Sequence, residues 1–155
     1  RLKSGDPFIF GRCMLEIQAL KNADCDFEVI PGISSVTAAP LLAGIPLTDA
    51  VMSKCFAVSS AHQPDILDWE ALSRLDTLVI LMGGKNLEKI VDQLIKYGKD
   101  RGTPIAIIRK AGTSEQQVWI AELSTVVEHV RTVRLSPAVI VIGEVVSLSK
   151  FSEKM

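Results

Sequence analysis

Two short segments in the first third of the chain carry residue types suited to holding a small ligand. In Ser4-Gly5-Asp6-Pro7, the glycine allows close backbone approach, and the aspartate supplies a carboxylate that can accept from an ammonium or a hydroxyl. Pro31-Gly32-Ile33-Ser34-Ser35 is a sharp turn followed by two hydroxyls and the free amides of a helix start. An ordinary turn with a helix-capping Asp or Ser has the same local pattern, so each segment alone leaves both interpretations open.

Further loops of this kind follow predicted strands later in the chain. They are Met82-Gly83-Gly84-Lys85, the segment 109–114 and the segment 135–138. Met82 would suit the face of a flat apolar ligand because a thioether adapts to aromatic rings, although a core methionine is the alternative. Ligands of α/β proteins bind at the carboxyl ends of strands, so we expect loops of this kind to converge on one crevice.

Several other chemistries lack their sequence signatures. The Met82 loop has neither the Walker spacing nor a Ser or Thr after Lys85, which makes phosphate cradling an unfavourable interpretation. His62 has Asp65 nearby, but the chain contains no G-x-S-x-G turn and no pair of carboxylates at catalytic spacing. Serine-hydrolase and paired-carboxylate mechanisms are therefore not indicated.

The histidines and cysteines predict no metal site. His62 and His129 lie far apart without ligand-like neighbours. Cys13, Cys25 and Cys55 form no CxxC, which indicates a reducing compartment and no disulfide framework. We expect these thiols to be small buried side chains.

Composition narrows the class of partner. The chain has 155 residues, a formal charge of −1, 48% hydrophobic residues and 23% charged residues. Such a chain can bury a core, and it lacks the basic clusters that drive nucleic-acid binding. No apolar run approaches the length of about 18 residues that crosses a bilayer. We expect a small-molecule ligand, no nucleic acid, no membrane, and a location in the cytoplasm or alternatively in a plastid.

Hydrophobic periodicity predicts alternating strands and helices. The strongest helix is 86–97, with Asn86 as its cap and Gly98 as its stop. Other helices are predicted at 11–23, from Ser34 or Ser35 to Leu42, and at 124–130. The segment 1–3 has the pattern of a strand end. Strands are predicted at 26–30, 55–59, 77–82, 104–108 and 117–123, with a final strand pair in 138–146.

These elements indicate an α/β fold in two parts. Residues 1–48 have the elements of the later part of an N-terminal α/β domain, and residues 49–155 those of a complete C-terminal α/β domain. A linker is expected around 45–52 because Pro46 interrupts any period there. A functional loop at the first residues suggests that the natural chain begins upstream of Arg1.

Taken together, the motifs resemble the tetrapyrrole methylase family, and within it the branch that C-methylates uroporphyrinogen III. The family pattern R-L-K-G-G-D-P-x-x-F-G-R matches residues 1–12 at all defined positions but one, and V-x-P-G-[IV]-[TS]-[SA] matches 29–35. A-G-I-P-L-T matches 43–48, and the remaining motifs of the family are similar to 78–83, 112–117 and 136–144. The resemblance covers nearly the whole chain, in order.

This resemblance implies a two-domain α/β enzyme that holds S-adenosylmethionine in a cleft. The implied reaction is the conversion of uroporphyrinogen III to precorrin-2 for sirohaem and cobalamin synthesis, usually by a homodimer. The implied cofactor contacts are Ser4, Gly5, Asp6, Ile9, Ser34, Ser35, Met82 and Gly112. Arg12 is the implied partner of substrate carboxylates, and the acid–base residues of the family are expected upstream of Arg1. We also expect residues 1–155 alone to lack turnover, because the resemblance implies that half of the cofactor wall lies outside them.

Departures from the family pattern keep two alternatives open. Ser4 stands where the family has the first glycine of a pair, and Cys13-Met14-Leu15 stands where Gly-Gly-Glu is usual. Thr48-Asp49 replaces the usual Thr-His. One alternative is a family member that methylates a later corrinoid or a non-tetrapyrrole acceptor. The other is a non-catalytic module that only folds or associates.

Overall fold

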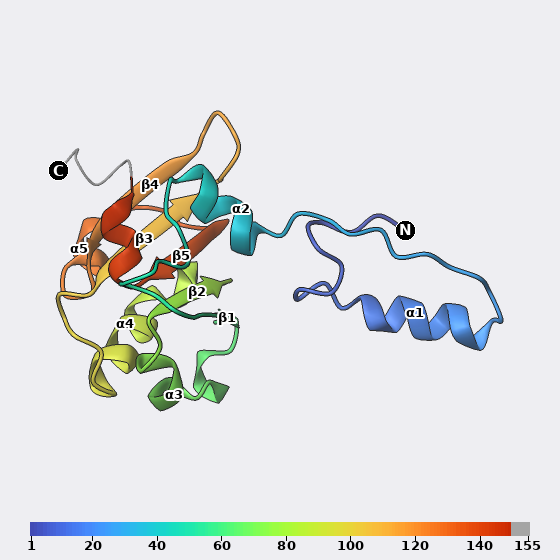
Figure 1. Cartoon of the computed structure of the whole chain (residues 1–155), viewed down its shortest axis with the longest axis horizontal. Helices are drawn as coiled ribbons and strands as arrows, with labels where there is room; N and C mark the ends of the chain where they lie inside the picture. Colours follow the sequence, from blue (N-terminus) through green and yellow to red (C-terminus); the bar gives the residue numbers. More distant parts are fainter. Residues whose placement is uncertain (150–155) are drawn as a thin grey trace.

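A computed structural model of the chain describes residues 1–149. It contains two regions, which we call the arm (residues 1–34) and the body (residues 35–149). The body is built on a five-stranded sheet, and the arm projects from it as a long loop that carries one helix (Figure 1).

The sheet has the strand order β1-β2-β5-β3-β4. The strands are β1 (Phe56–Ser60), β2 (Thr77–Leu81), β3 (Pro104–Arg109), β4 (Gln117–Glu122) and β5 (Ala138–Ile142). β1 and β2 are parallel, whereas β5 is antiparallel to both of its neighbours, β2 and β3. β1, β2 and β3 therefore point the same way, and their carboxyl ends lie at the edge of the sheet where β5 begins.

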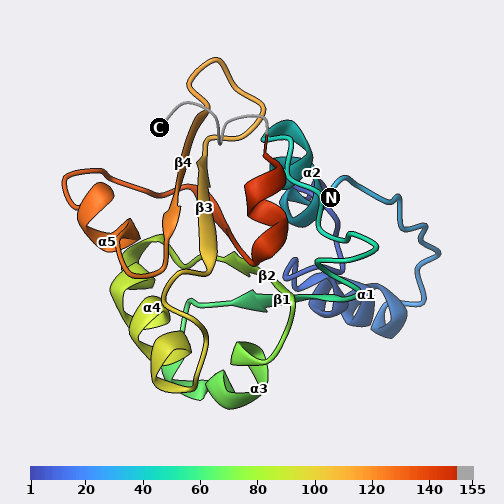
Figure 2. The same ribbon diagram turned by 60° about the vertical axis from the view of Figure 1, so that its left-hand side comes forward.

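Alternating apolar residues bury both faces of this sheet, because successive side chains of a strand point to opposite faces. In β5, Ile140 and Ile142 belong to one buried cluster and Val139 and Val141 to the other. The first cluster is covered by α3 (Trp69–Ser73), α4 (Leu87–Lys96) and α5 (Val126–His129). The second is covered by α2 (Ser35–Leu42) and by the 3₁₀ turn η3 (Glu144–Leu148) (Figure 2).

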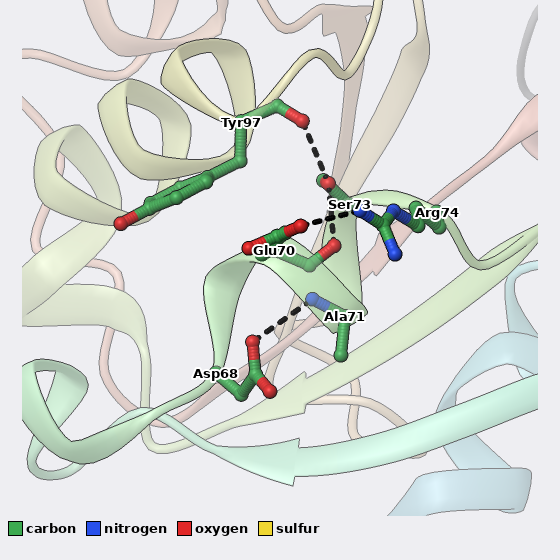
Figure 3. Close-up of polar contacts among 6 residues, drawn as sticks. All are labelled: Asp68, Glu70, Ala71, Ser73, Arg74 and Tyr97. Carbon is green, nitrogen blue, oxygen red and sulfur yellow. Dashed lines mark hydrogen bonds and ion pairs between the residues drawn. The ribbon is translucent and has the colours of Figure 1, made fainter.

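Helix α4 follows its predicted pattern. Leu87, Ile90, Val91 and Leu94 are buried at the spacing of one helical face, and Gly98 ends the helix with φ +95°. The five-residue helix α3, which sequence periodicity did not indicate, packs beside α4. The Ser73 hydroxyl lies 2.9 Å from the backbone oxygens of both Glu70 and Tyr97 and thus joins the two helices (Figure 3).

The arm folds back on itself without forming strands. Helix α1 (Cys13–Asn22) confirms the helix predicted at 11–23, but the strand end predicted at 1–3 and the strand predicted at 26–30 are wrong. A strand requires a neighbouring backbone to pair with. Within residues 1–149 no strand pairs with either segment.

The end of the last strand also differs from the prediction. The final strand pair in 138–146 is wrong: β5 ends at Ile142, and Gly143 leads into η3. An added Cβ at Gly143 would lie 2.3 Å from the Asp76 backbone oxygen, so the chain bends there in close contact with the segment before β2.

The cysteines are also not buried as expected. Cys25 and Cys55 are exposed and Cys13 is half-buried, all as free thiols.

The division of the chain between residues 48 and 49 stays a prediction. Helix α2 and the residues after it contribute to the second buried cluster. Val36, Ala39 and Ile45 are almost fully buried there. Helix α2, which precedes residue 48, therefore packs on the sheet of the body. The last six residues of the predicted C-terminal domain lie outside the described range.

Candidate functional site

A cavity of about 870 Å³ opens where β1, β2 and β3 end and β5 begins. Its size is within the range of roughly 300–1,000 Å³ that is usual for small-ligand sites. The lining mixes apolar residues with a few polar ones: Ser35, Ala39, His62, Leu81, Met82, Gly84, Lys85, Asn86, Ile108, Lys110, Ala111, Thr113, Ser136, Pro137, Ala138 and Val139. The expected convergence of strand-end loops is confirmed for the loops after β2, after β3 and before β5.

Met82 lies at this cavity immediately after β2. Its backbone is in the left-handed region with φ +57°, and half of its surface is exposed. A non-glycine residue in this conformation is strained by about 1–3 kcal/mol, and such strain is concentrated at ligand sites. The sulfur lies 3.9 Å from the Ser60 hydroxyl, so the side chain reaches across to the end of β1.

The loop after β3 forms a second wall. Lys110 also has a left-handed backbone, with φ +48°, and its ammonium pairs with Glu115 at 2.6 Å. The hydrogen bond from Lys110 lowers the pKa of the Glu115 carboxyl below its usual value. Gly112 lies between lining residues Ala111 and Thr113, and its N–H donates to the Gln116 side chain.

Helix α2 brings the second predicted segment to the cavity. Ser34 is its N-cap, and the Ser34 hydroxyl accepts from the Val36 N–H at 3.2 Å. The neighbouring Ser35 lines the cavity. In the Pro31–Ser35 segment, Ser34 therefore caps the helix, while its neighbour Ser35 lines the cavity.

The first predicted loop does not line this cavity. Ser4, Gly5, Asp6 and Ile9 all lie in the arm, where the Asp6 carboxylate accepts from the Phe8 N–H at 2.8 Å. Gly5 has φ +69°, and a Cβ placed on it would meet the backbone oxygen of Ile33 at 3.4 Å.

The two glycine turns nevertheless meet. A Cβ placed on Gly32 would lie 2.2 Å from the Gly5 backbone oxygen, which only a glycine permits. The first loop therefore packs against the turn that leads into α2, next to the edge of the cavity.

Arg12 lies at the start of α1, on the arm. It is exposed and has a left-handed backbone with φ +55°. The nearby ionic cluster involves other residues: Glu16 accepts from Lys3 at 2.5 Å and from Arg1 at 3.4 Å. The hydrogen bond from Lys3 lowers the pKa of the Glu16 carboxyl below its usual value.

The structure adds residues that the predicted set omitted. His62, Lys85, Asn86, Lys110 and Ser136 all line the cavity. Their signal was present in the sequence, since each lies at or near a strand end, but the side chains that face a cavity cannot be read from spacing alone.

Within residues 1–149, no group of His, Cys, Asp or Glu side chains could hold a metal ion, and no helix is long and apolar enough to cross a bilayer.

The sequence is similar to those of known proteins. A sequence profile of the tetrapyrrole (corrin/porphyrin) methylases matches residues 1–127. The chain is 51% identical to a uroporphyrinogen-III C-methyltransferase of Synechococcus elongatus, over 97% of this chain and 62% of that protein. It is 37% identical to an S-adenosyl-L-methionine-dependent uroporphyrinogen III methyltransferase of Methanosarcina barkeri, over 96% of this chain and 61% of that protein.

A solved structure shows the same fold. The uroporphyrin-III C-methyl transferase of Thermus thermophilus complexed with S-adenyl homocysteine superposes with a TM-score of 0.80 and 33% identity. The superposition covers 93% of this chain and 64% of that one. The chain thus spans about three fifths of the length of the curated relatives named above, 62% and 61%.

Proposed function

The chain belongs to the tetrapyrrole (corrin/porphyrin) methylase family, and on this basis we propose that it serves the S-adenosylmethionine-dependent C-methylation of uroporphyrinogen III. The proposed product is precorrin-2, the precursor of sirohaem and cobalamin. The observation that carries the proposal is the cavity at the strand ends, where Ser35, Met82 and the loop around Gly112 meet. These are positions at which the family resemblance implies cofactor contacts.

The cavity residues fit the chemistry of this cofactor. S-adenosylmethionine, when bound, supplies a methyl group carried by a positively charged sulfonium. Leu81, Ile108 and Val139 give the cavity apolar walls, which exclude water from the ligand. Met82 offers its thioether to a flat ring, and Ser35 offers a hydroxyl. The chain's own contribution is therefore to hold and orient donor and acceptor rather than to supply a nucleophile.

The arm is proposed to close the other side of this site. Ser4, Gly5, Asp6 and Ile9 do not line the cavity, but their loop packs against the turn before α2. We assign the exposed Arg12 to the carboxylates of the acceptor. Because the arm leaves the cavity open in residues 1–149, we also propose that residues 1–155 alone turn over uroporphyrinogen III poorly or not at all.

Calorimetry with S-adenosylhomocysteine tests the proposal. The chain should bind this product analogue, and Met82→Ala should weaken binding about tenfold, as expected when a large apolar contact is lost. Met52→Ala is the matched control, since Met52 is also part-exposed but does not line the cavity. Equal affinities of the Met82 variant and the unchanged chain would contradict the assignment of the cavity.

A second variant tests the arm separately. Asp6→Ala should also weaken binding of S-adenosylhomocysteine if the first loop contacts the cofactor. An unchanged affinity would remove Asp6 from the site and leave it with the local turn that it forms with Phe8.

We further propose that the protein is a homodimer in which the arm is covered. The arm exposes Phe8, Phe10, Met14 and Leu15, and exposed apolar patches of this kind mark interaction surfaces. In sedimentation experiments, Leu15→Asp should shift a dimer toward monomer. Ile66→Asp, at a similarly exposed residue of the body, should not. A chain that stays monomeric at high concentration would contradict this proposal.

The location proposed for the protein is the cytoplasm. All three cysteines are free thiols, and two of them are exposed, which suits a reducing compartment. Fractionation of the source cells with an antibody against the body would test it, and enrichment in an oxidising compartment would contradict it.

A further inference from the structure

Basic and acidic residue types are unevenly represented in the lining of the cavity. His62, Lys85 and Lys110 line it, and no Asp or Glu does. Lys110 is neutralised by Glu115, 2.6 Å away. Lys85, by contrast, makes no ion pair among residues 1–149 and is exposed to solvent at the cavity. Its ammonium is therefore the uncompensated positive charge of this site.

Two glycines determine where Lys85 lies. A Cβ on Gly83 would meet the side chains of Ile90 and Ile140 at 2.8 and 3.0 Å, and one on Gly84 would meet Leu135 at 3.2 Å. The turn after β2 therefore lies flat against the apolar core. This close approach holds Lys85 at the cavity lining, beside the first turn of α4.

Asn86 connects this turn to the segment that carries His62. Its side-chain N–H donates to the Ala61 backbone oxygen at 2.8 Å, and it makes no side-chain cap on α4. Asn86 thus stands at the N-cap position of α4 as predicted, but its side-chain amide bridges two loops instead of bonding to the helix. The bridge places Lys85 and His62, each one residue from a bridging partner, on neighbouring turns of the same cavity.

We propose that Lys85, with His62 beside it, forms a carboxylate-binding end of the cavity, and that Asn86 is the positioning residue of this pair. The inference rests on the proposed function and names the ligand group that the site selects. A carboxylate fits because an ammonium donates to it through a strong, charge-assisted hydrogen bond. The apolar remainder of the ligand would lie on Met82, Leu81 and Val139. Both the amino-acid part of the methyl donor and the side chains of a tetrapyrrole carry such carboxylates.

Binding of matched probes tests the proposal. Calorimetry would compare S-adenosylhomocysteine with its decarboxylated analogue, and fluorescence quenching would compare uroporphyrin III with coproporphyrin III, which has half as many carboxylates. Lys85→Gln should weaken binding of a carboxylate probe about tenfold, and Lys85→Arg should retain most of it. Lys54→Gln is the control, because Lys54 is exposed at the opposite edge of the sheet.

The pattern of losses identifies the source of the carboxylate. A Lys85→Gln effect on S-adenosylhomocysteine that is absent with its decarboxylated analogue assigns the group to the methyl donor. An effect on uroporphyrin III that is smaller with coproporphyrin III assigns it to the acceptor. Either result supports the proposal. Unchanged affinity for all four probes in Lys85→Gln would overturn it, as would failure of the unchanged chain to bind any of them.

The same probes separate this inference from the proposed function. If S-adenosylhomocysteine binds and depends on Met82 but not on Lys85, and the porphyrins also bind independently of Lys85, the proposed function stands and the carboxylate end fails. If only uroporphyrin III binds, in a manner that requires Lys85, the methyl-donor assignment fails and the carboxylate end stands.

Asn86→Ala provides a readout that a purely structural role would not give. We expect a loss of about threefold with the carboxylate probe that depends on Lys85, and no loss with the decarboxylated or less acidic partner. An equal loss with both members of a probe pair would show that Asn86 supports the cavity as a whole, and would overturn its role in positioning Lys85 and His62.

Discussion

The arm and the body contain similar apolar residues but use them differently. In the body, Ile107 and Ile140 are fully buried between a sheet and its helices. In the arm, Ile33 and Leu15 are 80% and 73% exposed, and Ile17 is the buried apolar residue of α1. More than half of the exposed large apolar side chains of the described residues lie in the arm. The difference shows that apolar content stabilises a region only when neighbouring backbone and helices cover it.

The largest expected contrast is in hydrogen exchange. Amides of β3 and β5 should exchange only by global unfolding, since both strands lie inside the sheet and are hydrogen-bonded on both sides. Their exchange should be slower than that of residues 26–33 by roughly 10³-fold or more, given a usual stability of 5 kcal/mol or above. Mass spectrometry of peptides after deuterium labelling would measure this. Equal protection would show that the arm has found a pairing partner in solution.

Truncating one isoleucine in each region should sharpen the contrast. Ile140→Ala should lower the free energy of unfolding by about 2–5 kcal/mol, because it leaves a cavity between the sheet and α4. Ile33→Ala should change it by less than about 0.5 kcal/mol. Urea titration followed by circular dichroism gives both values, with Ile140→Val as the milder variant if the alanine variant does not fold. A large loss for Ile33→Ala would mean that the arm is part of the cooperative unit.

A substitution at the junction between the arm and the body should have an intermediate effect on the free energy of unfolding. Ser34 belongs to the arm but caps α2 of the body, so Ser34→Ala should cost about 1 kcal/mol of stability. Ser34→Asp, which keeps an acceptor for the Val36 N–H, should restore most of it. If both variants are as stable as the unchanged chain, α2 does not depend on this cap.

The smallest effect is expected from the ionic cluster of the arm. Because the folded arm lowers the pKa of Glu16, its stabilising contact with Lys3 is fully present above the ordinary pKa of about 4.3 and is lost as the pH falls through the lowered value. Lys3→Met should return the Glu16 pKa toward its ordinary value, as measured by carboxyl NMR titration, and Lys21→Met should not. The stability of the body should be the same in both variants. A change in the stability of the body in the Lys3 variant would show that the folding of the arm and that of the body are coupled.

Local sequence signals predicted most of the elements of the body. Helix α4 shows the reason, because its apolar spacing and its terminal Gly98 indicate the same helix. The segments 1–3 and 26–30 show where such signals fail: they have strand-like patterns, but pairing depends on a neighbour that local pattern does not specify. Gly143 is a similar case, because its contact with the Asp76 backbone is between segments distant in sequence.

In the candidate site, too, local sequence signals predicted some residues, whereas the fold alone identified others. Met82 and the Gly112 loop were predicted from residue types at strand ends and Ser35 from a helix start, and the cavity brings them together. Lys85 and His62 were not assigned to the site, because the segments that hold them match neither the Walker pattern nor that of a serine hydrolase. Only the fold showed that Glu115 neutralises Lys110 while Lys85 has no ion-pair partner within residues 1–149.

The sequence by itself determined the family, most of the strands and helices of the body and several of the loops that line the cavity, because these depend on residue type and short-range spacing. The tertiary structure decided which side chains share the cavity, which cavity lysine pairs with a carboxylate, and that the first loop meets the turn before α2 through Gly5 and Gly32. The physical reason is distance: burial, ion pairing and backbone contact depend on atoms that are far apart along the chain and that only the folded sheet brings together.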